Sequence, residues 1–171
     1  HPDHATRKNN GLQLLWITPL RALGKDIGRA MENVIEELNL PWKIGIRNGD
    51  TSVTVRQQQK RNMPEVMIIT PESLQLLLAQ KGYPDLFKNL LVLAVDEWHE
   101  LLGSKRGVQV ELSISRIIHS QLAQSKSCCS VWGISATIGN LAEAKEVLLA
   151  PLLRSCNPEN IDAGIVHSKQ Q

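Results

Sequence analysis

The stretch that decides the fold is Leu90-Leu91-Val92-Leu93-Ala94-Val95-Asp96-Glu97. A run of apolar residues is followed at once by two acids. A continuous apolar run of this length is typical of a parallel strand that is covered on both faces. Functional side chains in an open parallel sheet gather at the carboxyl ends of the strands. Asp96 and Glu97 therefore mark the edge at which a site is expected.

Apolar runs of this kind recur along the chain and alternate with stretches of helical spacing. The other expected strands are Leu12–Thr18, Lys43–Arg47, Val66–Thr70 and Cys128–Ile134. The expected helices are Leu20–Leu38, a stretch capped by Thr51 or Ser52 that runs to Arg61, a helix opened by Pro71, Val108–Gln124 and Leu141–Leu149. Strand and helix in alternation predict an α/β fold with a parallel sheet and right-handed crossovers.

Length and composition fit one domain with an aliphatic core. The chain has 171 residues, of which 42% are hydrophobic but only 4% aromatic. No apolar stretch is long enough to span a bilayer. The net charge of +2 neither demands nor excludes nucleic acid, because phosphate binding needs local basic clusters. We expect a domain over residues 11–156, with loose polar ends over 1–10 and 157–171.

The cysteines Cys128, Cys129 and Cys156 bear on the compartment and on metal binding. An adjacent pair inside an apolar run indicates buried thiols in a reducing cytosol, so a cytoplasmic location is expected. The alternative, a zinc site, would need a second ligand pair at metal spacing, and the sequence does not offer one.

Polar segments follow the expected strands, which would bring them to one edge of the sheet. They are Thr18-Pro19, Thr70-Pro71-Glu72, Asp96-Glu97 and Ser135-Ala136-Thr137. The two hydroxyls of the last segment can reach Asp96 or His99. In the alternative interpretation they only cap the helix that starts near Asn140.

The acidic pair has a chemical interpretation of its own. An apolar strand that delivers two carboxylates is the Walker B arrangement. Asp96 can hold a magnesium ion through its water shell, because magnesium prefers oxygen ligands and loses water reluctantly. Glu97 can orient and deprotonate an attacking water. The alternative is that both acids only decorate a helix N-terminus, where the helix dipole favours them.

Two further segments have features that suit phosphates. Thr18-Pro19-Leu20-Arg21 is expected to start a helix, and free backbone N–H groups at such ends bind phosphates. Arg21, Lys25 and Arg29 recur every four residues as a basic stripe that can follow a nucleic-acid backbone. The alternative is a solvated helix face. In the turn Asn48-Gly49-Asp50, the glycine permits close approach of a phosphate.

Taken in order, these segments resemble the motifs of superfamily-two helicases. Motif Ia is resembled by Thr18–Leu23, the short glycine motif by Gly49-Asp50, motif Ib by Thr70–Leu74, motif II in its DExH form by Asp96–His99, and motif III by Ser135–Thr137. The runs Asp96–Gln109 and Trp132–Leu141 resemble the Lhr-type (large helicase-related) group. The tryptophan inside the DExH box favours the bacterial ligase-associated DNA-damage-response DExH-box branch.

The resemblance implies a RecA-like parallel sheet with helices on both faces, which here lacks its phosphate-loop strand. It implies that the intact parent uses ATP and Mg²⁺, that Asp96 contacts the Mg²⁺ and that Glu97 is the general base. His99 would couple hydrolysis to strand movement together with Ser135, Ala136 and Thr137. The single-strand track, which reads backbone rather than sequence, would be lined by Thr18, Pro19, Arg21, Gly49, Asp50, Thr70, Pro71 and Glu72.

One motif that the family needs does not occur in this sequence. No G-x-x-x-x-G-K-[ST] phosphate loop is present. The resemblance places that loop upstream of motif Ia and a second motor domain, with its arginine finger, after Gln171. We therefore expect a fragment of the first motor domain of an ATP-dependent helicase, which alone hydrolyses no ATP.

The expected partners are single-stranded nucleic acid, with DNA favoured by the branch resemblance, the second motor domain of the same parent, and a DNA ligase or nuclease. Rival interpretations remain. They are a nucleic-acid-binding module without catalysis, another α/β enzyme that binds a hydrolytic metal at Asp96 and Glu97, and a purely capping role for these acids.

Overall fold

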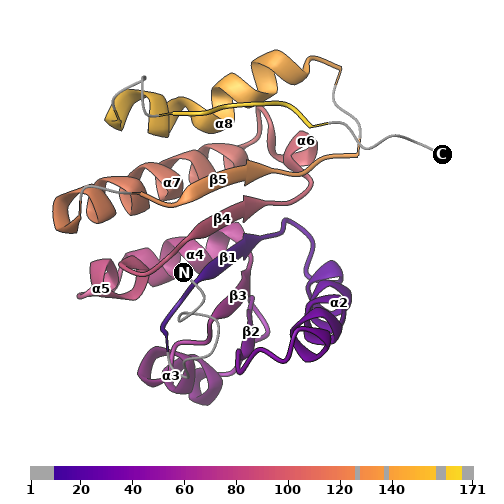
Figure 1. Cartoon of the computed structure of the whole chain (residues 1–171), viewed down its shortest axis with the longest axis vertical. Helices are drawn as coiled ribbons and strands as arrows, with labels where there is room; N and C mark the ends of the chain where they lie inside the picture. Colours follow the sequence, from indigo (N-terminus) through magenta and orange to yellow (C-terminus); the bar gives the residue numbers. More distant parts are fainter. Residues whose placement is uncertain (1–9, 126–127, 137–138, 157–160, 167–171) are drawn as a thin grey trace.

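The structure is a computed structural model that describes residues 10–125, 128–136, 139–156 and 161–166. Within these ranges, parallel strands form one sheet in the order β2-β3-β1-β4-β5 (Figure 1). The strands are Leu14–Ile17 (β1), Ile44–Arg47 (β2), Val66–Ile69 (β3), Val92–Val95 (β4) and Ser130–Gly133 (β5). Each lies inside a range predicted from the sequence. The predicted α/β fold with a parallel sheet is confirmed.

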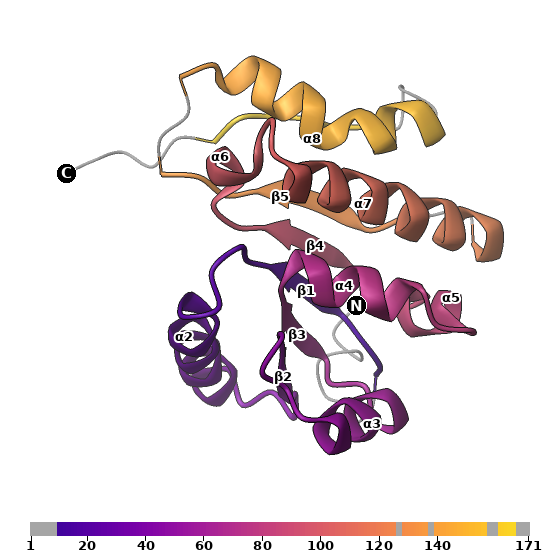
Figure 2. The same cartoon turned by 180° about the vertical axis from the view of Figure 1, so that it is seen from behind.

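Helices cover both faces of this sheet. They are Leu23–Glu37 (α2), Val53–Arg61 (α3), Pro71–Leu78 (α4), Tyr83–Phe87 (α5), Trp98–Leu101 (α6), Lys105–Gln124 (α7) and Leu141–Ser155 (α8). Figure 2 shows α4 and α7 in front of the sheet, and α7 contacts α4 on one side and α8 on the other. Ser52 caps α3, because its side chain accepts a hydrogen bond from the Val55 N–H, and Pro71 opens α4. Both features were predicted.

Some predicted helix bounds were wrong for identifiable reasons. Helix α2 begins at Leu23 rather than at Leu20, because a turn at Arg21 and Ala22 precedes it. Helix α7 begins at Lys105, earlier than predicted, because Ser104 caps it. Helix α8 continues to Ser155 and includes Pro151, since its packing against α7 outweighs the one hydrogen bond that a proline removes. The short helices α5 and α6 were not predicted, because a single turn shows no periodicity.

The main core lies between the sheet and the α4–α7–α8 layer. Leu15, Ile17, Leu93 and Val95 point into it and are fully buried, as are several residues of α4 and α7. The other face of β2 and β3 is covered by α2. There the helix touches the sheet through its glycines: a β-carbon at Gly24 would lie 3.7 Å from the Ile68 side chain. The large apolar residues of α2 are correspondingly not fully buried, and Val34 is exposed.

Strand β5 lies at one end of the sheet. No strand among the described residues pairs with its outer edge. On the face away from the main core, the backbone register aligns Trp16 with Ala94 and Ala94 with Trp132. Trp132 is 55% exposed although it belongs to a strand with an apolar sequence. An apolar run therefore predicts a strand here but not its burial.

The segments predicted to be loose fall largely outside the described residues. These are residues 1–9, 157–160 and 167–171, while 161–166 form neither helix nor strand. The predicted domain limits of 11–156 therefore stay a prediction. In the part of the chain that the structure describes, no helix is long and apolar enough to cross a membrane.

Candidate functional site

The acidic pair directly follows β4 at the carboxyl edge of the sheet. The Asp96 N–H donates to the carbonyl of Ile17 at 2.8 Å, which ties this segment to the end of β1. Asp96 is 9% exposed, and its carboxylate accepts the Glu97 N–H at 3.0 Å. Glu97 has a φ of 48°, a left-handed conformation that is uncommon for residues other than glycine. This sharp turn separates the two acids and starts α6.

His99 joins the acidic pair to the end of β5. Its Nδ1 lies 2.8 Å from the Ser135 hydroxyl and 3.4 Å from a Glu97 carboxylate oxygen. Its Nε2 lies 3.4 Å from Glu100, and the ring is 24% exposed. The structure thus brings together His99 and Ser135, which the sequence placed 36 residues apart. Ala136 is exposed, and Thr137 lies outside the described residues.

Trp98 anchors this segment to the interior of the protein. Its side chain is only 2% exposed, and its indole N–H donates to the carbonyl of Ala144 on α8 at 2.9 Å. Its backbone N–H donates to the carbonyl of Ile134 at 3.0 Å. Two adjacent elements therefore fix the start of α6, and the positions of Glu97 and His99 depend on that anchoring.

The two Thr-Pro segments end neighbouring strands, and their side chains are buried. Thr18 is 1% exposed and Thr70 is 3% exposed, and the prolines that follow them are buried as well. The Thr18 N–H donates to Ile69 at 3.0 Å, and the Thr70 N–H donates to Arg47 at 3.2 Å. Of the residues predicted to line the track, Thr18, Pro19, Thr70 and Pro71 thus face inward. The exposed members are Arg21, Gly49, Asp50 and Glu72.

Arg21 connects the first of these segments with the glycine turn. Its guanidinium pairs with Asp50 at 3.2 Å, and both side chains are largely exposed. A β-carbon at Gly49 would lie 2.8 Å from the Arg21 Nη2, so the arginine crosses directly over the glycine. Arg29 pairs with Asp26 at 3.9 Å. The predicted basic stripe is therefore partly neutralised, and Arg21 stands in a turn before α2.

Arg56, which the sequence interpretation missed, supports the glycine turn. The Arg56 Nη2 donates to the carbonyls of Asn48 and Gly49 at 3.1 and 3.2 Å. Arg47, at the end of β2, is 4% exposed. Its burial lowers the pKa of the guanidinium below its ordinary value, and the positive charge of Arg56 adds to this effect. The turn backbone is thus held by the guanidinium of Arg56.

Arg106, at the start of α7, is a further residue that the interpretation of single motifs missed. Its Nε donates to one oxygen of Glu72 at 2.7 Å, and its Nη2 lies 3.3 Å from the other oxygen. The same Nη2 donates to the carbonyl of Pro19 at 2.8 Å. Partial burial would raise the pKa of Glu72, but the hydrogen bond and charge of Arg106 outweigh it and hold that pKa below its ordinary value. The signal in the sequence was the cap Ser104, which places Arg106 in the first turn.

The cysteines lie away from this edge. Cys129 is 3% exposed, and the sulfurs of Cys128 and Cys156 are 3.5 Å apart. Burial raises the pKa of Cys128 to about 11, with the neighbouring Cys156 adding to the rise, and burial raises the pKa of Cys129 to about 12. Within the described ranges, no group of three or more His, Cys, Asp or Glu side chains is arranged to hold a metal ion.

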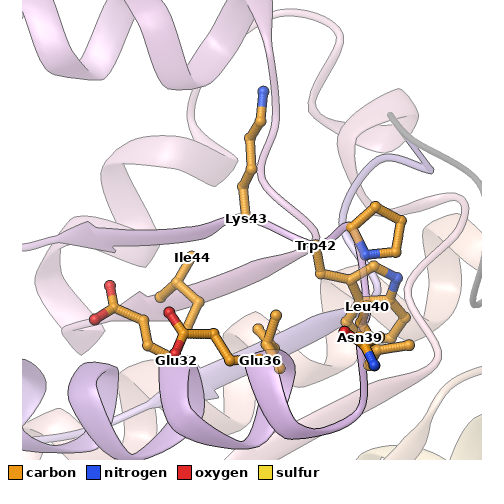
Figure 3. Close-up of a pocket in the computed structure, with 9 residues that line it drawn as sticks. Glu32, Glu36, Asn39, Leu40, Trp42, Lys43 and Ile44 are labelled. Atoms are coloured by element: carbon orange, nitrogen blue, oxygen red, sulfur yellow. The ribbon is translucent and has the colours of Figure 1, made fainter.

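A surface hollow of about 820 Å³ lies at the opposite end of the sheet (Figure 3). It is lined by the last turns of α2, the loop that follows and the start of β2. The close-up shows the carboxylates of Glu32 and Glu36 on one side of the hollow and Trp42 on the other. Since Ile44 begins β2 there, the hollow is separated by the length of the strands from Asp96 and Glu72. It contributes nothing to the site at the carboxyl edge.

Comparison with known proteins gives the following similarities. The family described as DEAD/DEAH box helicase matches residues 3–144. The Lhr helicase/uracil glycosylase of Escherichia coli is 31% identical over 82% of this chain and 10% of its own length. An ATP-dependent helicase Lhr-Core of Methanocaldococcus jannaschii is 32% identical over 81% of this chain and 17% of its own. The Mycobacterium smegmatis helicase Lhr, solved with ssDNA and AMP-PNP, superimposes with a TM-score of 0.71 and 30% identity over 86% of this chain and 20% of that one.

The chain thus spans about a tenth to a fifth of the length of the relatives it matches. The similarity covers the fold and the edge at which the predicted motifs meet. The relatives carry Lhr names, so the resemblance to the Lhr-type group is confirmed. The narrower ligase-associated branch stays a prediction.

Proposed function

Since this chain belongs to the DEAD/DEAH box helicase family, we propose that the protein containing it couples ATP hydrolysis to movement along single-stranded nucleic acid. The observation that supports this proposal is the cluster of side chains at the carboxyl edge of the sheet. Asp96, Glu97, His99 and Ser135 meet there, beside the turns and helix starts that end β1, β2 and β3. A hydrolytic centre and a phosphate-binding surface would then share one edge.

The residues present fit one half of a magnesium–nucleotide site. One carboxylate oxygen of Asp96 accepts the Glu97 N–H, which leaves the other free for a water of a hydrated magnesium ion. Because no three-ligand cluster stands nearby in the described residues, such an ion would also need oxygens from the nucleotide phosphates. Magnesium bound there would neutralise the charge that develops on the transferred phosphoryl group.

We assign the role of general base to Glu97. One of its carboxylate oxygens lies 3.4 Å from the Nδ1 of His99. A carboxylate in this position can accept the proton of an attacking water. Asp96 would hold the hydrated magnesium ion through its carboxylate, so the two acids would have separate tasks.

His99 and Ser135 would transmit the state of the site to the neighbouring strand. Their contact of 2.8 Å joins the acidic segment to the end of β5. A change at Glu97 that moves the imidazole must alter this hydrogen bond. Ala136 and Thr137 continue the same segment, so we assign them to the same coupling role.

The strand track would lie over the exposed residues of the same edge. Arg21, Gly49 and Asp50 form one exposed patch, and Glu72 stands at the N-terminus of α4. The buried members, Thr18, Pro19, Thr70 and Pro71, would act by shaping the backbone there. The Mycobacterium smegmatis helicase Lhr was solved with ssDNA, which favours DNA over RNA for this chain.

The finer expectations attach to the same proposal. The second motor domain of the parent would face this edge and supply positive charge to the phosphates. A role in DNA repair and a DNA ligase or nuclease as partner remain predictions from the branch resemblance, and a cytoplasmic location remains a prediction from the cysteines.

The central test is a Glu97→Gln substitution in the full-length protein. We expect DNA-stimulated ATP turnover to fall by roughly a hundred- to ten-thousandfold, as is usual when a general base is lost. Binding of a fluorescent single-stranded oligonucleotide should persist. The matched control is Glu146→Gln, which removes an exposed acid from α8. Near-normal turnover of the Glu97 variant would show that the base is another residue.

A second arm separates the motor from a binding module without catalysis. The 171-residue chain alone should hydrolyse no ATP, since it contains no phosphate loop. Appreciable turnover by this chain that disappears on Glu97→Gln would contradict the assignment. If the full-length protein binds single strands but has no affinity for nucleotide, the binding module is the correct interpretation. Single-stranded DNA and RNA of equal length, compared as stimulators, decide the substrate.

A further inference from the structure

Arg106 reaches two segments of the proposed strand track at once. Its guanidinium donates to both oxygens of Glu72, at 2.7 and 3.3 Å, and to the carbonyl of Pro19, at 2.8 Å. Glu72 belongs to the first turn of α4, and Pro19 follows β1. The planar fork of an arginine can satisfy three acceptors in this way, whereas a lysine is a point charge. One side chain thus fixes the spacing of two segments that the chain separates by more than fifty residues.

The position of Arg106 is itself fixed by the acidic segment. Ser104 caps α7, accepting the Gly107 N–H at 3.1 Å and donating to the carbonyl of Leu101 at 2.7 Å. A β-carbon at Gly107 would lie 2.1 Å from that same carbonyl oxygen, so α6 and α7 touch backbone to backbone. Helix α6 begins directly after Glu97. A continuous series of contacts therefore runs from the acidic pair through α6 to Arg106 and on to the track.

Charge gives Arg106 a second task. Glu72 is 53% exposed and would present a negative charge where phosphates are expected to pass. A carboxylate in that place repels a nucleic-acid backbone unless a cation is paired with it. Arg106 supplies that cation while holding the carboxylate against α7. The cation is 39% exposed, and its Nε and Nη2 donors are used within the protein, so only Nη1 would be available to a phosphate.

We propose that Arg106 is a positioning residue for the strand track, which it ties to the acidic segment by holding Glu72 and Pro19 together and by neutralising Glu72. The proposal rests on the proposed function, because it concerns the strand-binding part of the same edge. It assigns Arg106 no direct contact with nucleotide or nucleic acid.

The test compares Arg106→Gln with the parent in the full-length protein. ATP turnover is measured against the concentration of a single-stranded DNA oligonucleotide at several salt concentrations. We expect the half-saturating DNA concentration to rise roughly three- to tenfold, because the substitution removes one partly exposed network of charge-assisted hydrogen bonds. The maximal rate at saturating DNA should change far less. The dependence of affinity on salt should keep its slope, since no phosphate contact is removed.

Matched variants separate positioning from general damage. Lys105→Gln removes the neighbouring exposed charge and should leave the half-saturating concentration within about twofold, as expected of a surface position. Adding Glu72→Gln to Arg106→Gln should restore much of the DNA affinity, because the unpaired negative charge is then gone. Arg106→Lys should restore the charge but not the fork, so its effect should lie between those of the parent and Arg106→Gln.

Two outcomes would overturn the inference. In the first, Arg106→Gln, folded as judged by circular dichroism, leaves the half-saturating concentration unchanged while Glu97→Gln still abolishes turnover; then Arg106 positions nothing and the proposed function stands. In the second, the salt slope falls by about 0.7 and Glu72→Gln gives no rescue; then Arg106 contacts a phosphate directly. Absence of any DNA-stimulated turnover in the parent would remove both the inference and the proposed function.

Discussion

A methyl group at Gly107 should disrupt the joint between α6 and α7. The added β-carbon would lie 2.1 Å from the carbonyl oxygen of Leu101 and 2.9 Å from its carbon. Both are backbone atoms and cannot rotate away. Separations under 3.0 Å are essentially never seen for real β-carbons, so the two helices must move apart by at least 0.9 Å, the difference between 3.0 and 2.1.

That movement has a definite cost. The Leu101 carbonyl also accepts the Ser104 N–H at 3.0 Å and the Ser104 hydroxyl at 2.7 Å, and both bonds would lengthen. Overpacking of this kind typically costs about 1–3 kcal/mol. The gain from replacing a helical glycine with alanine is at most about 1 kcal/mol, so it does not offset the clash. With that gain subtracted, we expect Gly107→Ala to lower the free energy of unfolding by up to about 2 kcal/mol.

Gly24→Ala provides a control of opposite sign. Gly24 is also buried in a helix, but a β-carbon there would meet only side chains, at 3.7 and 3.8 Å, which is ordinary contact. Restricting the unfolded chain should then stabilise the protein by about 0.4–1 kcal/mol.

The assay for both variants is urea unfolding of the 171-residue chain, followed by far-UV circular dichroism. A difference of 2 kcal/mol separates the midpoints by about 1 M. If Gly107→Ala proved as stable as Gly24→Ala, the close contact between α6 and α7 would be wrong. The path from the acidic segment to Arg106 would lose its support as well.

Two further predictions concern the interior. Gln121 is 4% exposed; it donates to the carbonyls of Phe87 and Leu90 and accepts the Cys129 N–H. Gln121→Met should therefore lower the free energy of unfolding by about 2–3 kcal/mol, at roughly 1–3 kcal/mol for each of the two groups that lose this partner, the Leu90 carbonyl and the Cys129 N–H, since the Phe87 carbonyl still accepts the Leu90 N–H. A loss no larger than that of the exposed control Gln124→Met, measured by urea unfolding, would contradict this. The second prediction follows from the raised thiol pKa values: with a pKa of about 11 against an ordinary 9.0, Cys128 at pH 8 should carry about a hundredfold less thiolate than a free cysteine. Its alkylation by iodoacetamide should be correspondingly slow and should accelerate as the pH rises above 9, and fast alkylation of the folded chain at pH 8 would refute the burial.

The sequence was sufficient for the fold because its signals are local. Val66–Ile69 and Val92–Val95 are buried parallel strands, and their unbroken apolar runs indicate that arrangement directly. Ser52 and Pro71 mark helix starts through interactions with their own neighbours in the chain. Such features depend on a few consecutive residues, so one sequence is enough to predict them.

Features that depend on distant partners were not predictable. Trp132 lies in an apolar run yet is 55% exposed, because the described sheet ends at β5 and the exposure of a strand depends on what pairs with it. Helix α8 continues through Pro151 because α7 packs along it. The role of Arg106 depends on its contacts with Glu72 and Pro19, and no rule of sequence spacing connects these positions. The left-handed backbone conformation of Glu97 could not be predicted from the local sequence either.

The buried Thr-Pro segments change how the predicted motifs should be understood. At Thr18 and at Thr70 the threonine N–H makes the last bond to the neighbouring strand. The proline that follows has no N–H to extend the sheet further, so both strands end at the same level. Pro71 then opens α4 and places Glu72 at the edge, whereas Pro19 leads into the turn that carries Arg21 across Gly49. These segments therefore align the strand ends, and in the proposed function the charged residues just after them would supply the surface that a phosphate backbone meets.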